Sequence, residues 1–195
     1  MKKLVLCLCL VCVSCIACFA QTDQDKQKAI SDFRFKIHQL EIYNMVLPVL
    51  LKKDQIRSIL KEVEKIREKR REILDAQYKL MRQLQNGVDD ALVAASTRGA
   101  IPGQQLVGQL YKATQATLIE LSLWSSEATD LIYTTVTATL DKGQQTVMAK
   151  TLNPRDFPDQ LKKPEEVSQA DRIKIFIRNV FLDPDAYDIL VKMSI

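Results

Sequence analysis

Glycine and proline are scarce in this chain, which has five glycines and six prolines among 195 residues. No run of β-branched residues alternates with polar ones, as it would in a half-buried strand. From Lys52 to Arg98 the sequence has one glycine and no proline, so a single helix can occupy the whole segment. These absences predict an all-α fold.

Cysteine is confined to one end of the chain, at Cys7, Cys9, Cys12, Cys15 and Cys18. The same end has a basic start at Lys2–Lys3, an apolar run over Leu4–Val13 and small residues at Ala17–Ala20, which is the order of a secretory signal peptide cut after Ala20. The exported chain would then have no disulfide, no thiolate nucleophile and no cysteine metal ligand. An alternative is a lipoprotein anchored at Cys15 or Cys18.

Charge and catalytic residue types argue against several functions. Removal of Lys2 and Lys3 with the leader would lower the formal net charge from +4 to +2, a balance that does not suggest nucleic acid or another polyanion as partner. The chain has one histidine, with no obvious serine partner, and no glycine-rich loop of the phosphate-binding type. We therefore expect neither an enzyme nor a bound cofactor.

The single histidine, His38, precedes Glu41 by three residues, so both lie on one face of an expected helix. A histidine beside a carboxylate can begin a metal site, although zinc usually takes three or four protein ligands. One chain does not supply that set here, whereas a dimer would contribute two histidines. Metal binding at His38 and Glu41 is kept as a minor alternative.

Two long segments repeat apolar residues at alternating spacings of four and three, the pattern of a coiled-coil seam. In the first arm the seam positions are Ile59, Val63, Ile66, Arg70, Ile73, Gln77, Leu80, Leu84, Gly87, Ala91 and Ala94. In the second arm they are Val107, Leu110, Thr114, Thr117, Leu121, Trp124, Ala128, Leu131, Thr135 and Ala138. Because Gly99–Gly103 separates the arms, we predict an elongated antiparallel helical hairpin, in which each arm needs the other or a second chain to bury its stripe.

Shorter elements flank the hairpin. We expect a short N-terminal helix of four turns that ends near Pro48, and a helix over Gln144–Leu152. Ser168 is the expected cap of a helix that reaches Phe181, and Asp183 the cap of a last one. The resulting divisions are 1–20 (signal peptide), 21–152 (helical hairpin domain) and 153–195 (proline-containing strap and C-terminal helices).

A five-residue pattern occurs twice, as Leu51–Gln55 and Leu140–Gln144. In each copy a leucine is followed four residues later by a glutamine at an expected helix start. A glutamine at the third helical position can return a hydrogen bond to the backbone of the cap residue. We therefore treat Leu51, Gln55, Leu140, Asp141 and Gln144 as motif and capping residues.

The two copies resemble the twin Leu-Thr-x-x-Gln motifs of the periplasmic Spy and CpxP family. The order of features is also similar: an export signal, a short helix, the first motif on a long charged helix, a return helix and the second motif. The resemblance covers roughly residues 33–152. Lys52 stands where the family has threonine and is a poor cap, whereas Asp141 is a good cap followed by Gly143, which weakens the first turn.

The resemblance implies a helical homodimer that binds unfolded or partly folded envelope proteins without ATP, or that inhibits an envelope-stress sensor domain. On the first arm the candidate client-binding cations are Arg57, Lys61, Lys65, Lys69 and Arg70. These cations have a simpler explanation too, as a solvated ridge paired with the neighbouring Glu64, Glu68 and Glu72. Arg70 and Gln77 fall on the seam itself, where they either set its register or mark where it opens.

Three functions thus remain open. The leading hypothesis is a periplasmic ATP-independent chaperone or stress adaptor of Spy and CpxP type. The second is a structural or assembly module that docks on one fixed protein partner. The third is a periplasmic metal sensor based on His38.

Overall fold

The computed structural model describes residues 2–153 and 163–195, and every regular element in those residues is helical. It forms two compact units, Met1–Asn44 and Met45–Ile195. The predicted all-α class is confirmed. Among the described residues, none of the helices combines the length and the apolar character needed to cross a membrane.

The first unit is a single helix. α1 covers Lys2–Val46, 45 residues, and so ends just inside the second unit. It is much longer than the four turns expected, because no glycine or proline interrupts the sequence before Pro48. Its end was predicted correctly: the 3₁₀ turn η1 (Leu47–Val49) follows at once, with Pro48 in its first positions.

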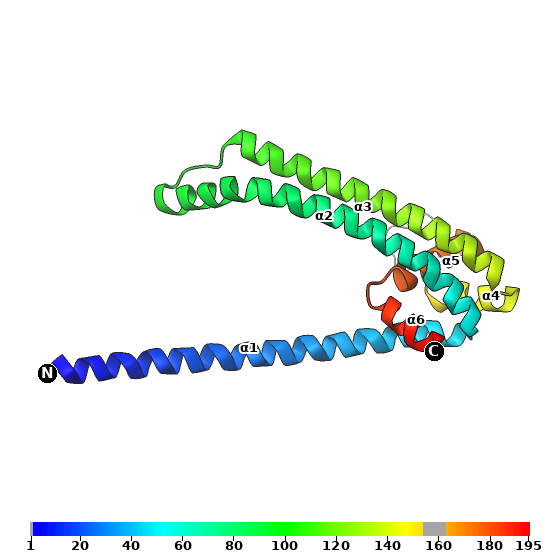
Figure 1. Cartoon of the computed structure of the whole chain (residues 1–195), viewed down its shortest axis with the longest axis horizontal. Coiled ribbons are helices and arrows are strands. Elements are labelled where there is room, and N and C mark those ends of the chain that lie inside the picture. Colours follow the sequence, from blue (N-terminus) through cyan, green and yellow to red (C-terminus); the bar gives the residue numbers. More distant parts are fainter. Residues whose placement is uncertain (1, 154–162) are drawn as a thin grey trace. The chain divides into compact units, whose positions relative to one another are not determined.

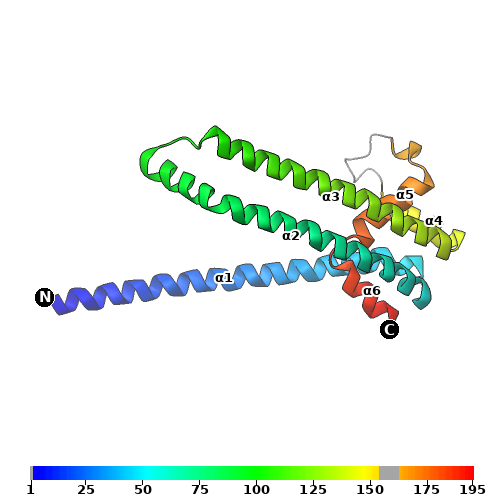
Figure 2. The same cartoon turned by 45° about the horizontal axis from the view of Figure 1, so that its top comes forward.

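The second unit is built on the predicted helical hairpin. α2 covers Lys53–Arg98, 46 residues or about 69 Å at roughly 1.5 Å per residue, and α3 covers Gln104–Thr139. The two helices lie side by side in both views (Figures 1 and 2). Gly99 ends α2 in the left-handed conformation at φ 62°, which glycine adopts without steric cost.

Four elements close the end of the hairpin opposite the 99–103 turn. They are α4 (Lys142–Thr151), α5 (Gln169–Phe176), the π-helical segment η4 (Ile177–Phe181) and α6 (Ala186–Ser194). The 3₁₀ turn η3 (Pro164–Glu166) lies between α4 and α5 in the sequence. Figure 1 shows α4, α5 and α6 gathered there. Most of the predicted strap lies outside the described residues.

The caps of the C-terminal helices were predicted in part. Ser168 caps α5, since its side chain accepts a hydrogen bond from the backbone nitrogen of Asp171 at 3.1 Å. The last helix begins later than expected, at Ala186. The carboxylate of Asp183 instead accepts from the backbone nitrogen of Asp185 at 2.8 Å and forms a turn before the helix.

The core is concentrated at the base of the hairpin, which we define as residues 53–70 of α2 and 124–139 of α3. Its buried side chains include Ile56, Ile59, Val63, Ile66, Ala128, Ile132 and Val136. Phe176 and Phe181 from the C-terminal segment are also buried and contact each other edge to face, with ring centroids 5.3 Å apart. The C-terminal elements α5, η4 and α6, which we call the tail, therefore contribute buried side chains to the same core as the base of the hairpin.

The seam of α3 differs from the prediction after Ala128. There Ile132 and Val136 are fully buried, whereas the predicted Leu131 is 41% exposed. The buried residues follow the 3.6-residue period of a straight helix, because α5 and η4 add a second packing partner to this part of α3. On α2 the predicted Gly87 is exposed and Val88 is partly covered in its place.

Candidate functional site

The two glutamines of the repeated pattern meet at the base of the hairpin. Gln55 Nε2 donates a hydrogen bond to Gln144 Oε1 at 2.9 Å, and Gln144 Nε2 donates one back to Gln55 Oε1 at 3.0 Å. The two carboxamides thus form a closed reciprocal pair across 89 residues of sequence. We call this arrangement the glutamine pair.

Each member of the glutamine pair also binds the backbone on both sides. Gln55 Oε1 accepts from the backbone nitrogen of Lys52 at 2.9 Å, and Gln144 Oε1 accepts from that of Asp141 at 3.2 Å. The remaining amide donors reach the carbonyls of Thr139 and Leu50, both at 2.9 Å. Every donor and both lone pairs of each carboxamide are therefore used, which a buried polar pair requires.

The glutamine pair joins two stretches of the chain, residues 50–55 and 139–144. Each glutamine caps its own helix and binds the segment that leads into the other motif. Gln144 is buried at 9% exposure and Gln55 is half-buried. Because a buried amide without partners is costly, the pair favours one register of α2 against the start of α4.

The capping role of both glutamines was predicted from sequence, but their contact was not. Two helix starts at the same end of an antiparallel hairpin were the available signal, since α3 returns the chain to the level at which α2 begins. That signal predicts only that the two helix starts are close to each other. The mutual bonding depends on side-chain rotamers that no spacing reveals.

The flanking motif residues support the junction. Leu140 is buried at 5% exposure, and Leu51 is half-buried. Asp141 caps α4 as predicted, because its Oδ1 accepts from the backbone nitrogen of Gln144 at 2.8 Å. Glycine at position 143 was expected to weaken the first turn, but it also leaves room for the cap. A Cβ at this position would lie 3.1 Å from Asp141 Oδ1 and crowd it.

The candidate client-binding cations do not form one uniform ridge. Arg57 pairs with Asp54 at 3.1 Å, and Lys65 pairs with Glu62 at 3.0 Å. Lys69 reaches across the hairpin to Glu127 of α3. The expected pairing with residues three positions further along is therefore replaced at Lys65 and Lys69, while the exposed Lys61 lies between these pairs on the same helix.

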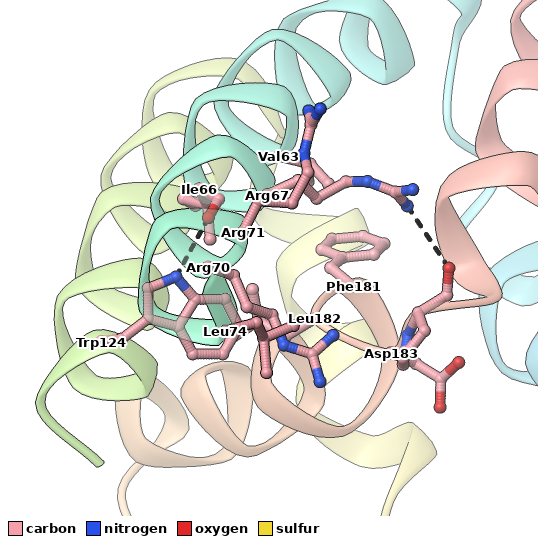
Figure 3. Close-up of a pocket in the computed structure, with 11 residues that line it drawn as sticks. Val63, Ile66, Arg67, Arg70, Arg71, Leu74, Trp124, Phe181, Leu182 and Asp183 are labelled. Atoms are coloured by element: carbon pink, nitrogen blue, oxygen red, sulfur yellow. Dashed lines mark hydrogen bonds between the residues drawn. The ribbon is translucent and has the colours of Figure 1, made fainter. Parts of the chain in front are cut away.

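Arg70 differs from the other four cations. Its guanidinium carbon lies 5.5 Å from the ring centroid of Trp124, and its Nε is shielded from solvent with no hydrogen-bond partner among the described residues. Trp124 is held in place because its indole nitrogen donates to the carbonyl of Ile66 at 3.0 Å (Figure 3). Arg70 was predicted to be a polar residue on the seam, and in the structure it lines a cavity of about 140 Å³.

A larger cavity, of about 730 Å³, lies between the arms toward the turn. We call it the tip groove. Its lining includes Tyr78, Leu80, Met81, Leu84 and Val88 from α2 and Leu110, Ala113, Thr117, Leu118 and Leu121 from α3. The lining is mainly apolar, and the volume is typical of ligand-binding clefts.

Comparisons with protein-family models, with curated proteins and with solved structures gave no match. The resemblance to the Spy and CpxP family therefore depends on the residues of the two motifs and on the order of the helices.

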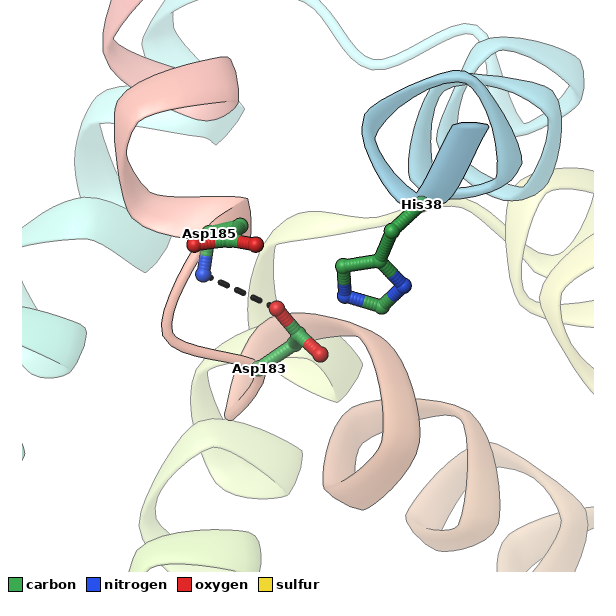
Figure 4. Close-up of side chains that lie close together, drawn as sticks. All are labelled: His38, Asp183 and Asp185. Carbon is green, nitrogen blue, oxygen red and sulfur yellow. Dashed lines mark hydrogen bonds between the residues drawn. The ribbon is translucent and has the colours of Figure 1, made fainter. Parts of the chain in front are cut away.

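The metal alternative has limited geometric support within each unit. In the first unit His38 Nδ1 lies 3.8 Å from Glu41 Oε2, and both side chains are largely exposed at 41% and 62%. In the second unit Asp183 and Asp185 lie close together, joined by the hydrogen bond that the backbone nitrogen of Asp185 donates to the Asp183 carboxylate (Figure 4). Two ligands in either place are short of the three or four that zinc takes.

Proposed function

We propose that this protein is an exported, ATP-independent chaperone or stress adaptor of Spy and CpxP type, which holds partly folded proteins at the tip groove. The signal peptide ending at Ala20 and assembly as a homodimer belong to the same proposal. The observation that carries it is an apolar groove in the half of the hairpin that the tail helices leave uncovered.

The surface around the groove suits reversible capture of unfolded chains. Met81 and Leu118 line the groove and are 62% and 55% exposed. Met adapts its shape to varied apolar partners at little conformational cost. An exposed apolar patch of this kind is a common mark of a protein-binding surface.

Charge supports the proposal at the level of encounter. The exposed cations Lys61, Lys79 and Arg82 lie along α2, so an acidic segment of a client would be attracted to this arm. Such attraction raises the association rate more than the affinity. Binding should therefore accelerate at low salt, while the dissociation rate stays nearly constant.

A matched pair of double variants tests the role of the groove. Met81→Ser with Leu118→Ser changes two groove residues, and Leu92→Ser with Ile119→Ser changes two residues outside its lining that are 63% and 58% exposed. We expect only the first variant to lose most suppression of client aggregation at near-equimolar ratio. Equal suppression by both variants would contradict the proposal.

The alternative function, docking on one fixed protein partner, would use the same groove as the chaperone function. The two hypotheses differ in how many different proteins the groove binds. The chaperone hypothesis expects the mature chain to suppress aggregation of several unrelated denatured proteins. An assembly module would suppress none of them and would bind one native protein with defined stoichiometry. Light scattering with three or more clients separates these outcomes.

A further inference from the structure

The small cavity beside Arg70 has the composition of a ligand site that neither the motifs nor the tip groove explains. It has a volume of about 140 Å³, close to the roughly 150 Å³ at which an engineered cavity accommodates benzene. Arg67, Arg70 and Arg71 of α2 line it, together with an apolar surface that includes Val63, Trp124 and Phe181. Figure 3 draws these residues together, with Trp124 on one side of the α2 helix and Phe181, Leu182 and Asp183 on the other.

The three arginines are not neutralised within the described residues. The ridge cations Arg57, Lys65 and Lys69 each have a carboxylate partner, but no salt bridge reaches Arg67, Arg70 or Arg71 in that part of the chain. Asp183 is the one acidic residue in the lining. The cavity therefore has an excess of positive charge that favours an anion.

Two of the arginines are held by neighbouring groups. Arg67 donates to the carbonyl of Pro184 at 3.4 Å, and its guanidinium carbon lies 4.1 Å from the ring centroid of Tyr187. Arg70 is fixed beside Trp124, and its shielded Nε has no acceptor among the described residues. Buried donors almost always have an acceptor, and an exception often marks a place where a bound group completes the set.

The ligand must satisfy both halves of this cavity. A guanidinium matches the two oxygens of a carboxylate, and the aromatic and aliphatic walls need an apolar body of about the size of a phenyl ring. A free inorganic anion would leave those walls uncovered, and a neutral hydrocarbon would leave the arginines unpaired. Leu74, 42% exposed, and the exposed Arg71 lie where the cavity meets solvent.

We propose that this cavity binds a carboxylate carried on a small apolar group. Two sources share that chemistry: a free aromatic or branched aliphatic acid, and the C-terminal residue of a polypeptide that ends in an apolar side chain. The site is separate from the tip groove, so its existence does not depend on the chaperone proposal.

Trp124 is the only tryptophan in the chain and lines this cavity, so its fluorescence should change when a ligand binds there, and the Arg70 and Arg71 variants below separate that change from binding at the neighbouring cavity beside Lys69 and Glu127. Titration of the full chain with sodium benzoate should give a saturable change in that fluorescence, with the affinity confirmed by calorimetry. Benzyl alcohol and inorganic phosphate should each bind at least about tenfold more weakly, the loss of one charge-assisted hydrogen bond or of the apolar contact. Equal binding of either probe, or no saturable change with benzoate, would overturn the proposal.

Substitutions locate the site. Arg70→Gln should weaken benzoate binding by about tenfold or more, as expected for one arginine–carboxylate contact. Arg98→Gln, at an exposed position of the same helix outside the cavity, is the matched control and should bind as the unaltered chain does. If circular dichroism shows that Arg70→Gln is unfolded, the exposed Arg71→Gln gives the same test. Undiminished binding in a folded Arg70→Gln or Arg71→Gln chain would contradict the site.

A peptide pair separates the two sources. A tetrapeptide that ends in phenylalanine with a free carboxylate is compared with the same peptide ending in an amide. Binding of the acid alone indicates the C-terminus of a polypeptide. Binding of benzoate but of neither peptide indicates a free small acid, and equal binding of acid and amide would contradict carboxylate recognition.

Discussion

The base and the tip of the hairpin use the same two helices in different ways. At the base α2 and α3 carry nearly all their buried side chains, from Ile56 to Ile66 and from Ala128 to Val136. At the tip, which we define as residues 77–98 and 104–121, Thr117 is the one residue of the two helices that is buried. Both halves have a seam of heptad type, so periodicity alone does not explain the difference.

The difference arises from the number of elements that meet. Two helices can shield only a narrow stripe between them, whereas at the base α5 and η4 also pack on α3, and α6 packs on α2. A paired seam without such cover stays partly solvated and leaves apolar side chains accessible. The fold thus separates a stabilising base from a tip that remains available for binding.

The largest expected effect contrasts core positions of the two halves. Ile132→Ala at the base removes a fully buried side chain and should lower the free energy of unfolding by about 2–5 kcal/mol. Leu118→Ala at the tip, where the side chain is 55% exposed, should change it by about 0.5 kcal/mol or less. Urea unfolding followed by circular dichroism measures both. Similar losses at the two sites would remove the distinction between base and tip.

The glutamine pair should give the next largest effect. Gln55→Ala or Gln144→Ala leaves the other carboxamide partly unpaired and should cost about 1–3 kcal/mol each. The double variant should cost less than the sum of the two, because the second change removes the group that the first left unpaired. Gln83→Ala, at an exposed position of α2, is the control. Strict additivity in the urea midpoints would show that the two side chains do not interact.

Of the two glycines in the turn at the tip, only Gly99 should lower the stability of the fold appreciably when it is replaced by alanine. Gly99→Ala forces a side chain into the left-handed region at φ 62° and should cost about 1 kcal/mol. Gly103→Ala has φ −63° and open space around a new Cβ, so it adds no backbone strain and should cost only the few tenths of a kcal/mol, roughly, by which alanine is a poorer N-cap than glycine. Thermal unfolding of the two variants checks this. A larger loss at Gly103 would place the strain of the turn elsewhere.

The smallest effect concerns pH and the attachment of the tail to the base. A hydrogen bond to Asp130 at 2.7 Å raises the pKa of Lys174 above its ordinary 10.5, and a hydrogen bond to Glu64 at 2.8 Å raises the pKa of Tyr187 above its ordinary 10.0. Both groups favour their protonated forms in the folded chain. Their contribution is complete below the unfolded pKa values and is lost as pH rises through the folded ones.

Stability should therefore fall in strongly alkaline solution. The loss should be smaller in Tyr187→Phe with Lys174→Met, whereas Tyr111→Phe with Lys112→Met at the tip should behave as the unaltered chain does. Because all these groups are near the surface, the difference should be small and should shrink at high salt. Unfolding midpoints measured across this pH range provide the test. An unchanged alkaline loss in the base variant would exclude these two contacts as its cause.

Most of the secondary structure followed from local sequence. The absence of proline across α2 predicts an uninterrupted helix. Helix boundaries are predicted by the glycine at position 99 and by the caps Asp141 and Ser168, without reference to the rest of the fold. The four turns expected of the first helix are far fewer than those of α1, which covers Lys2–Val46. No residue there breaks a helix, so continuation was equally consistent with the sequence.

The candidate sites were harder to predict from the sequence than the helices were. Residues such as Arg70 were identified as polar interruptions of a seam, but the cavity beside it is completed by Phe181 and Pro184, more than a hundred positions further along the chain. A periodic pattern identifies the residues that face a partner. It does not identify which partner supplies the remaining wall.

Local sequence specified most of the helices, most of their ends and the sense of the hairpin, because capping, proline and glycine act within a few residues. The tertiary structure alone decided that Gln55 binds Gln144, that α3 changes its buried face after Ala128, and that the tail covers the base and leaves the tip open. Those outcomes depend on side chains that are distant in sequence and share one space. Their energies are set by packing and mutual hydrogen bonding, which local sequence does not encode.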